Sequence, residues 1–247
     1  MVRQSFDLTA VIKHKDYDFL RSNPQLKDQL IFLTLSGSYA YGTALASSDI
    51  DIRGCAFNRK HDLLTLKTFK HYTDTKTDTT VYGFIHFIEL LASSNPHMLE
   101  LLGNEPADYL IFNDIAREII AKKKLFLAKQ AAVTYRGYID RQLKSIKNNP
   151  KAAMHVIRLY LTAIDLFIKE DIINKRTAEH KLLMAIRNGC FLQADGNYHN
   201  DYFELVADYH KQFDRALAIS KLPDTVDYPA IQDFILSVNE RVVKGEY

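Results

Sequence analysis

The sequence predicts an α+β protein, with strands and helices mixed in its first hundred residues and helices in the remainder. Two short apolar segments of the first part, residues 30–35 and the stretch around Ile50 and Ile52, have the length and pattern of strands. In the second part, apolar residues recur every three or four positions, as along residues 157–168, which is typical of amphipathic helices.

The first two strands enclose a glycine turn. The apolar run of residues 30–35 ends at Ser36-Gly37-Ser38, so we expect a buried strand followed by a turn. Further along, Ile50 and Ile52 alternate with Asp49 and Asp51. This alternation predicts a second strand that begins at Asp49 and continues to about residue 57.

Later elements of the first part are a strand and two helices. We expect a third strand over residues 79–82, which leads into an amphipathic helix over residues 84–91. Asn95-Pro96 then breaks the chain, and because proline is tolerated in a first helical turn, another helix is expected to start there. Few strand signals appear after residues 109–112, so we divide the chain into a mixed unit, residues 1–103, and a helical unit, residues 104–247.

Composition excludes several protein classes. The chain has 247 residues, 47% hydrophobic and 25% charged, which is unlike a disordered chain, a collagen-like repeat or a disulfide scaffold. Cys55 and Cys190 lie far apart and form no CxxC pair, which argues against a cysteine-based zinc site and fits a reducing compartment. The apolar runs are too short to span a bilayer, and residues 1–7 lack the apolar core of a signal peptide. We therefore expect a cytoplasmic protein without a membrane partner.

Charge is unevenly distributed, although 32 basic residues nearly balance 30 acidic ones and leave a net charge of +2. Between residues 117 and 158, eleven basic residues are opposed only by Glu118 and Asp140, a net charge of +9. The eleven are Arg117, Lys122, Lys123, Lys124, Lys129, Arg136, Arg141, Lys144, Lys147, Lys151 and Arg158. Two interpretations stay open: a solvated helix face, or an electropositive wall that faces phosphates.

The glycine turn and the two aspartates suggest a site for a phosphate and a metal ion. On a strand, Asp49 and Asp51 would project from the same face, roughly 6–7 Å apart, where oxygen ligands suit Mg²⁺. Gly37 permits a tight turn and the close approach of a ligand to the backbone, and the Ser38 hydroxyl with the amides after it could receive a phosphate. The alternative is an ordinary strand-to-helix turn.

In combination, these residues resemble a known family. The segment Gly37-Ser38-Tyr39-Ala40-Tyr41-Gly42-Thr43, followed by Ser48-Asp49-Ile50-Asp51-Ile52-Arg53-Gly54, is similar to the Gly-Ser…Asp-x-Asp signature of the polymerase-β-like nucleotidyltransferase superfamily. Later segments resemble a bacterial and phage branch of predicted nucleotidyltransferases, some of them encoded near RNA ligase and polynucleotide kinase genes. They are Asn95-Pro96, Glu100-Leu101-Leu102, Lys151 to Leu159 with its Lys…His-x-x-Arg-Leu pattern, Ile186-Arg187-Asn188-Gly189 and Ser220-Lys221-Leu222-Pro223.

The resemblance implies a fold and a reaction. The fold would be a small mixed β-sheet with flanking helices as the catalytic core, residues 1–103, followed by an all-helical domain, residues 104–247. The reaction would be the Mg²⁺-dependent transfer of a nucleoside monophosphate from an NTP, ATP included, to a hydroxyl acceptor with release of pyrophosphate. The acceptor stays open between an RNA end, a protein side chain and a small molecule, and the oligomeric state is not predicted.

The same resemblance assigns the catalytic acids. Family members normally add a third carboxylate on a later strand and bind two Mg²⁺ ions, so Asp49, Asp51 and Asp78 are the expected catalytic residues and metal ligands. Asp74 is the second choice for the third carboxylate. The alternative for Asp78 is a residue that shapes the turn between two elements.

The helical unit supplies the basic candidates. Lys151, His155 and Arg158 are spaced four and three apart and share one helix face. The resemblance favours their contact with the triphosphate, alongside Gly37 and Ser38, whereas the alternative has Arg158 paired with Asp165 or Glu170 and His155 satisfied by backbone. Arg187 is a weaker candidate for phosphate binding. A second functional hypothesis is a weak or inactive NTP-binding module in an RNA-repair or toxin–antitoxin complex.

Overall fold

The computed structural model describes residues 8–247, with side chains from residue 11 onward. The segment 1–7, which we expect not to be a signal peptide, lies outside the described residues. Within this range no helix is long and apolar enough to cross a membrane.

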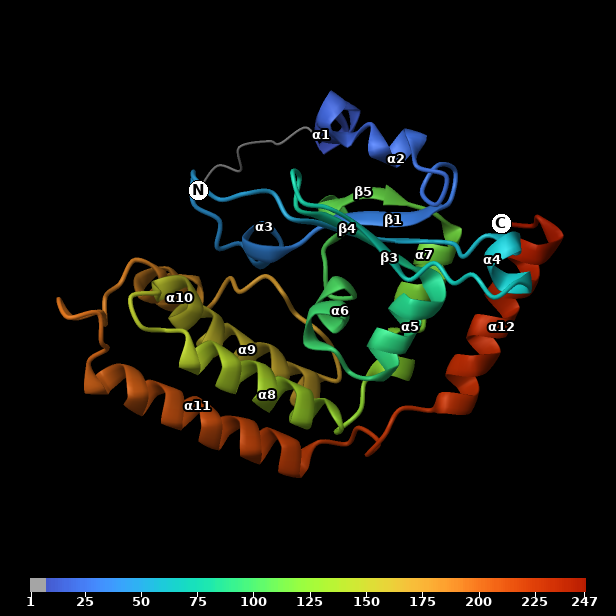
Figure 1. The fold of residues 1–247 in the computed structure, drawn as a ribbon. Helices are drawn as coiled ribbons and strands as arrows, with labels where there is room; N and C mark the ends of the chain where they lie inside the picture. The colour runs from blue at the N-terminus through green and yellow to red at the C-terminus, as the bar shows by residue number, and fades with distance from the viewer. Residues whose placement is uncertain (1–7) are drawn as a thin grey trace.

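A mixed five-stranded sheet forms one side of the molecule (Figure 1). Its strands are β1 (Leu30–Leu35), β2 (Ile52–Ala56), β3 (His71–Asp74), β4 (Thr79–Gly83) and β5 (Tyr109–Phe112). They lie in the order β3-β4-β2-β1-β5, with β2 and β4 parallel and the other neighbours antiparallel. The mixed sheet confirms the α+β class, and β3, whose side chains are exposed or half-buried, was not predicted.

Helices account for most of the remaining described residues. The α-helices are α1 (Leu8–Lys13), α2 (Phe19–Ser22), α3 (Gly37–Tyr41), α4 (Lys60–Leu64), α5 (Phe84–Ala92), α6 (Pro96–Leu101), α7 (Asp114–Ala121), α8 (Ala131–Lys144), α9 (Pro150–Lys169), α10 (His180–Arg187), α11 (Asn200–Ile219) and α12 (Tyr228–Lys244). Short 3₁₀ helices span Lys15–Tyr17, Pro106–Asp108 and Lys123–Phe126.

Apolar side chains bury both faces of the sheet. Leu33, Ile52 and Val81 pack with Tyr17 and Leu20 beneath the N-terminal helices α1 and α2, which cover one face (Figure 1). On the opposite face, the main hydrophobic cluster starts at β1 and β2 and continues through α5, α6 and α7 into the helical part. The site residues therefore start from strands whose positions are fixed from both sides.

The helical part is organised around α9, which α8, α10 and α11 contact. Asn149 caps this helix by accepting a hydrogen bond from the amide of Ala152 at 3.1 Å, and Pro150 occupies its first turn. Asn95 and Pro96 start α6 in the same way, as expected. The helix α9 is thus the rigid element that carries Lys151, His155 and Arg158.

The two halves of the chain are joined by more than their linker. β5 follows residue 103 and pairs with β1, and α12 returns to pack on α4 and α5 (Figure 1). One hydrophobic cluster contains residues from both halves. The division into residues 1–103 and 104–247 stays a prediction about domain organisation.

The second strand begins later than predicted. β2 starts at Ile52, so Asp49, Ile50 and Asp51 precede the strand instead of belonging to it. The reason is that β1 ends at Leu35, opposite Ile52, where the chain turns into α3. The amide of Ser36 still donates a hydrogen bond to the carbonyl of Asp51 at 2.8 Å, but no neighbouring strand extends beyond that point.

Candidate active site

The glycine turn after β1 brings the chain against an aspartate. Gly37 has a φ of +57°, in the left-handed region that favours glycine. A Cβ at this position would also collide with the Asp51 carboxylate. Glycine is therefore required here twice, once for the backbone conformation and once to let Asp51 lie directly against the turn.

Asp51 and Asp78 lie side by side because β2 and β4 are parallel. The register pairs Ile52 with Thr79, so the residues that immediately precede the two strands become neighbours. Asp78 adopts a positive φ of 42°, and its side chain accepts a hydrogen bond from Arg53 at 3.0 Å. Asp74 instead accepts hydrogen bonds from Thr77 within the turn, which excludes it from this pair.

The two neighbouring carboxyl groups shift each other's pKa in opposite directions. Burial, together with the hydrogen bond to Asp78 and the charge of Asp78, raises the pKa of Asp51 to about 6. The hydrogen bond from Asp51, followed by the charge of Arg53, lowers the pKa of Asp78. Lys151 lowers the pKa of both carboxyls, which places its ammonium group in the field of the pair.

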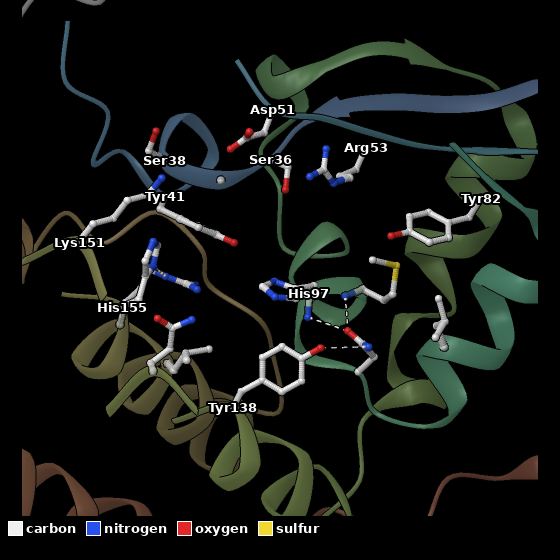
Figure 2. Close-up of a pocket in the computed structure, with 17 residues that line it drawn as sticks. Ser36, Ser38, Tyr41, Asp51, Arg53, Tyr82, His97, Tyr138, Lys151 and His155 are labelled. Carbon is white, nitrogen blue, oxygen red and sulfur yellow. Dashed lines mark hydrogen bonds between the residues drawn. The ribbon is translucent and has the colours of Figure 1, made fainter. Parts of the chain in front are cut away.

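Two neighbouring cavities meet at this point. The larger has a volume of about 460 Å³ and lies between the sheet, α6, α8 and α9, and the smaller has about 210 Å³. Ser38, Asp51 and Lys151 line both, so they stand at the junction. Figure 2 shows Ser38, Tyr41 and Lys151 on one side of the larger cavity, with Tyr82 opposite and Tyr138 below.

A buried polar cluster forms one wall of the larger cavity; we call Tyr41, Glu100, His155 and Arg158 the Glu100 cluster. The Arg158 side chain is only 2% exposed, and its Nη1 donates to Glu100 Oε1 at 2.7 Å. The Tyr41 hydroxyl donates to the other Glu100 oxygen at 2.6 Å, and the guanidinium carbon of Arg158 lies 3.6 Å from the centre of the Tyr41 ring. Glu100 is thus satisfied on both oxygens.

His155 is a neutral member of this cluster. Burial first, and then the charges of Arg158 and Lys151, hold the pKa of His155 well below its usual range. Its Nδ1 accepts a hydrogen bond from Nε of Arg158 at 3.2 Å, which assigns the hydrogen to Nε2. His155 therefore presents a hydrogen-bond donor without a positive charge.

The structure separates the three basic residues predicted on α9. All three line the larger cavity, but Arg158 already uses two of its nitrogens within the Glu100 cluster. The partners suggested for Arg158 were wrong, since Asp165 pairs with Arg176 and Glu170 lies near Lys124, but Arg158 does form an ion pair, with Glu100. Contact of Arg158 with a phosphate stays a prediction.

Arg187 and Lys151 bring unused donors to the smaller cavity. Nη2 of Arg187 donates to the Ser48 hydroxyl at 3.2 Å, but its Nε and Nη1 are buried with no hydrogen-bond partner among the described residues. Lys151 is exposed and, over residues 11–247, has no carboxylate within 4.0 Å. Because buried donors are normally paired, the open nitrogens of Arg187 indicate a place for an anion.

A divalent cation fits this edge in part. Asp51 and Asp78 are close enough for the charge of Asp78 to raise the pKa of Asp51, a repulsion that a cation would relieve, and Asp49 lines the same small cavity. Within the described part of the chain, however, no group of three His, Cys, Asp or Glu side chains is arranged to hold a metal. Mg²⁺ commonly takes only one or two carboxylates and completes its shell with phosphate and water, so the pair fits that ion.

Several cavity residues were not predicted as site residues. Arg53 fixes Asp78, and Glu100 fixes Arg158, although the sequence assigned neither a chemical role. Tyr138 and Gln142 also line the larger cavity, and their spacing of four on α8 is the only sequence signal that places them on one face.

A protein-family model matches most of the chain. A model of the RlaP family, described as the RNA repair pathway DNA polymerase beta family, matches residues 10–234. The search of curated proteins found no match. The matched range includes the glycine turn, the paired aspartates and the basic face of α9.

Proposed function

Since this chain belongs to the RNA repair pathway DNA polymerase beta family, we propose that it is a Mg²⁺-dependent nucleotidyltransferase. Membership indicates nucleotidyltransferase-like activity in an RNA repair pathway, and the metal, the NTP and the residue roles below are proposals. One observation carries them: Ser38, Asp51 and Lys151 stand where two cavities meet, so a phosphate there would face a hydroxyl, a carboxylate and an ammonium group, with Asp78 close by in the smaller cavity.

The substrate can be placed from the chemistry of the two cavities. The larger cavity has the volume expected for a small-molecule site and contains Tyr82, which suits a nucleoside. The smaller one holds the serine hydroxyls and the unused donors of Lys151 and Arg187, which suit phosphates. We therefore place the α-phosphate of the NTP at the junction and its β- and γ-phosphates in the smaller cavity.

Asp51 and Asp78 would hold Mg²⁺, with Asp49 as the nearest further carboxylate. When bound, the ion would offset negative charge on the phosphates and on the attacking oxygen. The paired carboxylates support one ion, and the second ion implied by the resemblance depends on Asp49 turning toward the pair.

The transfer step follows from these positions. The acceptor hydroxyl oxygen forms a bond to the α-phosphorus of the NTP while the bond from the α-phosphorus to the oxygen that bridges to the β-phosphate breaks. The proton of the hydroxyl passes to the Asp51 carboxylate, which lines both cavities and has the higher pKa of the pair. Lys151 and Arg187 stabilise the charge that accumulates on the departing pyrophosphate. His155 contributes a neutral N–H donor whose orientation Arg158 fixes, and Glu100 positions Arg158.

Label transfer tests the proposal. The protein would be incubated with each α-labelled NTP, Mg²⁺ and RNAs that carry different termini, and label on RNA and pyrophosphate release would be measured. The wild type is expected to transfer label, and Asp51→Asn is expected to lower the rate at least about 1000-fold, because it removes a ligand and a charge aimed at the reacting phosphate. Asp114→Asn, an exposed carboxylate on α7, is the matched control and should leave the rate unchanged.

Two results would reject this function. One is the absence of both label transfer and pyrophosphate release with every NTP and acceptor. The other is an equal loss of activity in Asp51→Asn and Asp114→Asn, since a specific role for Asp51 would then be excluded.

The second candidate is an NTP-binding module without turnover. The observation in its favour is that no group of three metal-binding side chains is arranged for a metal within the described residues. This candidate predicts that NTP binding without Mg²⁺ survives Asp49→Ala and Asp51→Ala and that no pyrophosphate is released by any variant.

A further inference from the structure

The basic segment of residues 117–158 divides into two parts with different surroundings. In the first part, up to Arg136, most basic side chains pair with carboxylates that lie close in space. These pairs are Arg117 with Asp114, Lys123 with Asp171, Lys124 with Glu170, Lys129 with Asp224 and Arg136 with Asp214. The basic side chains of this part are therefore neutralised by nearby carboxylates of the same chain, and little net charge is left to attract a partner.

The second part has no such partners. Residues 141–151 contain Arg141, Lys144, Lys147 and Lys151 and no acidic residue, and all four are exposed. We call Arg141, Lys144 and Lys147, which precede the cavity residue Lys151, the basic strip. Over the described side chains, residues 11–247, no carboxylate lies within 4.0 Å of their charged groups.

Nearby acidic residues do not cancel the strip. Lys147 contributes to the lowered pKa of Asp195 from a distance, without an ion pair. Asp140 lies one turn before Lys144 on α8, but over residues 11–247 it forms no ion pair with Lys144 within 4.0 Å, and its charge also raises the pKa of Tyr160. Positive charge therefore stays exposed on this surface.

The strip leads into the proposed active site. It follows the end of α8 and the loop to α9, and its continuation, Lys151, stands at the junction of the two cavities. Tyr138 and Gln142, on the same stretch of α8, line the larger cavity. The guanidinium carbon of Arg141 lies 4.6 Å from the centre of the Tyr138 ring, so a charged group and an aromatic ring adjoin at the cavity rim.

We propose that the basic strip binds the phosphate backbone of a single-stranded RNA acceptor and guides its terminal hydroxyl to the junction of the two cavities, where the α-phosphate is placed. Exposed cations spaced along the chain suit successive phosphates, and a tyrosine with an arginine over it suits an unstacked base. An acidic protein would match the charge but would not use the aromatic rim or supply an end narrow enough for the cavity. This inference rests on the proposed function, because it identifies the acceptor for that reaction.

An RNA-binding measurement under conditions without catalysis tests the role of the basic strip. A fluorescent single-stranded RNA would be titrated with protein at several salt concentrations, without NTP or Mg²⁺, and anisotropy would report affinity. Replacing the three strip residues together (Arg141→Gln, Lys144→Gln, Lys147→Gln) should weaken binding about 10–100-fold at low salt and reduce the logarithmic salt slope by about 2, as expected when three phosphate contacts are lost.

A matched triple variant controls for total charge. Arg117→Gln, Lys124→Gln and Lys129→Gln remove the same charge from the paired part of the segment and should change affinity less than about 2-fold. Equal losses in both triples, or no loss in the strip triple, would overturn the inference. Preferential binding of an acidic peptide would overturn the assignment to nucleic acid.

Failure of this inference is distinguishable from failure of the proposed function. Asp51→Asn should bind the RNA like the wild type, since it lies outside the strip. Strip-dependent binding without label transfer would contradict only the proposed reaction, whereas label transfer to RNA at an unchanged KM for RNA in the strip triple would contradict only the role of the strip.

Discussion

Two polar regions border the two adjoining cavities and differ in how completely their groups are satisfied. In the Glu100 cluster, Glu100 accepts from Arg158 and Tyr41, and Arg158 also donates to His155. At the edge formed by Asp51, Asp78 and Arg187, two neighbouring carboxylates repel each other and two arginine nitrogens have no partner among the described residues.

The difference separates positioning from binding. A buried charge whose partners are complete has no capacity left for a ligand, and removing one partner exposes the full desolvation cost of the other. A charge with open donors gains most from a ligand that supplies the missing partner. The comparison therefore predicts that substitutions in the Glu100 cluster affect mainly stability. Substitutions at the edge formed by Asp51, Asp78 and Arg187, which we call the open edge, should affect mainly nucleotide binding.

The largest effect on stability is expected from Glu100→Gln. The change leaves the buried Arg158 guanidinium without its counter-charge, and loss of one member of a buried ion pair typically costs about 3–5 kcal/mol. Urea denaturation followed by circular dichroism would measure the free energy of unfolding. Adding Arg158→Met should restore at least half of the loss, because the stranded charge is then absent.

A small effect of Glu100→Gln on the free energy of unfolding would contradict the distinction between the two regions. A loss of unfolding free energy below about 1 kcal/mol is typical of an ion pair exposed to water. The Glu100–Arg158 pair would then not be the buried, fully partnered pair described above. A double variant no more stable than Glu100→Gln would show that shape, and not the unbalanced charge, determines the loss.

Sequence periodicity placed the three basic residues of α9 on one face but did not identify their surroundings. The partner of Arg158 is 58 residues away, on α6, and helix periodicity contains no information about which distant carboxylate will face it. Only the packing of α6 against α8 and the position of α9 decide this. For the same reason the sequence suggested Asp165, which lies on the same helix but pairs with Arg176.

Strands were predicted where one or both faces are buried. β1 matches the expected residues 30–35, and β4 extends the expected segment by one residue. β3 was missed because its side chains are exposed or half-buried and give no apolar pattern. The proximity of Asp78 to Asp51 depends on the register of two parallel strands, which spacing alone does not determine.

A change at the open edge should show the opposite behaviour. Arg187→Gln removes a guanidinium with two unused nitrogens, so the affinity for NTP is expected to fall about 10–100-fold, the value of one charge-assisted contact, with little change in Tm. Titration calorimetry with NTP and Mg²⁺ would measure affinity, and Lys181→Gln, an exposed cation on the same helix, is the control.

The reverse result would contradict a ligand-binding role for Arg187. If Arg187→Gln lowers Tm by several degrees and leaves NTP affinity unchanged, Arg187 belongs to the structural network. If Lys181→Gln weakens NTP binding equally, general electrostatic attraction explains the effect.

The smallest effect concerns pH and again compares the two regions. His155 is neutral in the folded protein because burial and neighbouring cations lower its pKa, whereas in the unfolded chain its pKa is about 6.5. As pH falls below about 6.5, the unfolded chain binds a proton that the folded protein does not, so His155 contributes a loss of stability on acidification. Asp51 acts in the opposite sense, since its raised pKa favours proton binding by the folded state as pH falls through about 6.

Comparison of His155→Gln with the wild type isolates the histidine, because Asp51 contributes to both proteins. Between pH 7 and 5.5 the wild type should lose about 1 kcal/mol more than the variant, equivalent to a difference of about 2–4 °C in the shift of Tm. Thermal unfolding at both pH values in Mg²⁺-free buffer measures this difference. Identical shifts would mean that His155 takes up a proton in the folded state as readily as in the unfolded chain, and the Glu100 cluster would then have to admit a second cation beside Arg158, which its present hydrogen bonds do not accommodate.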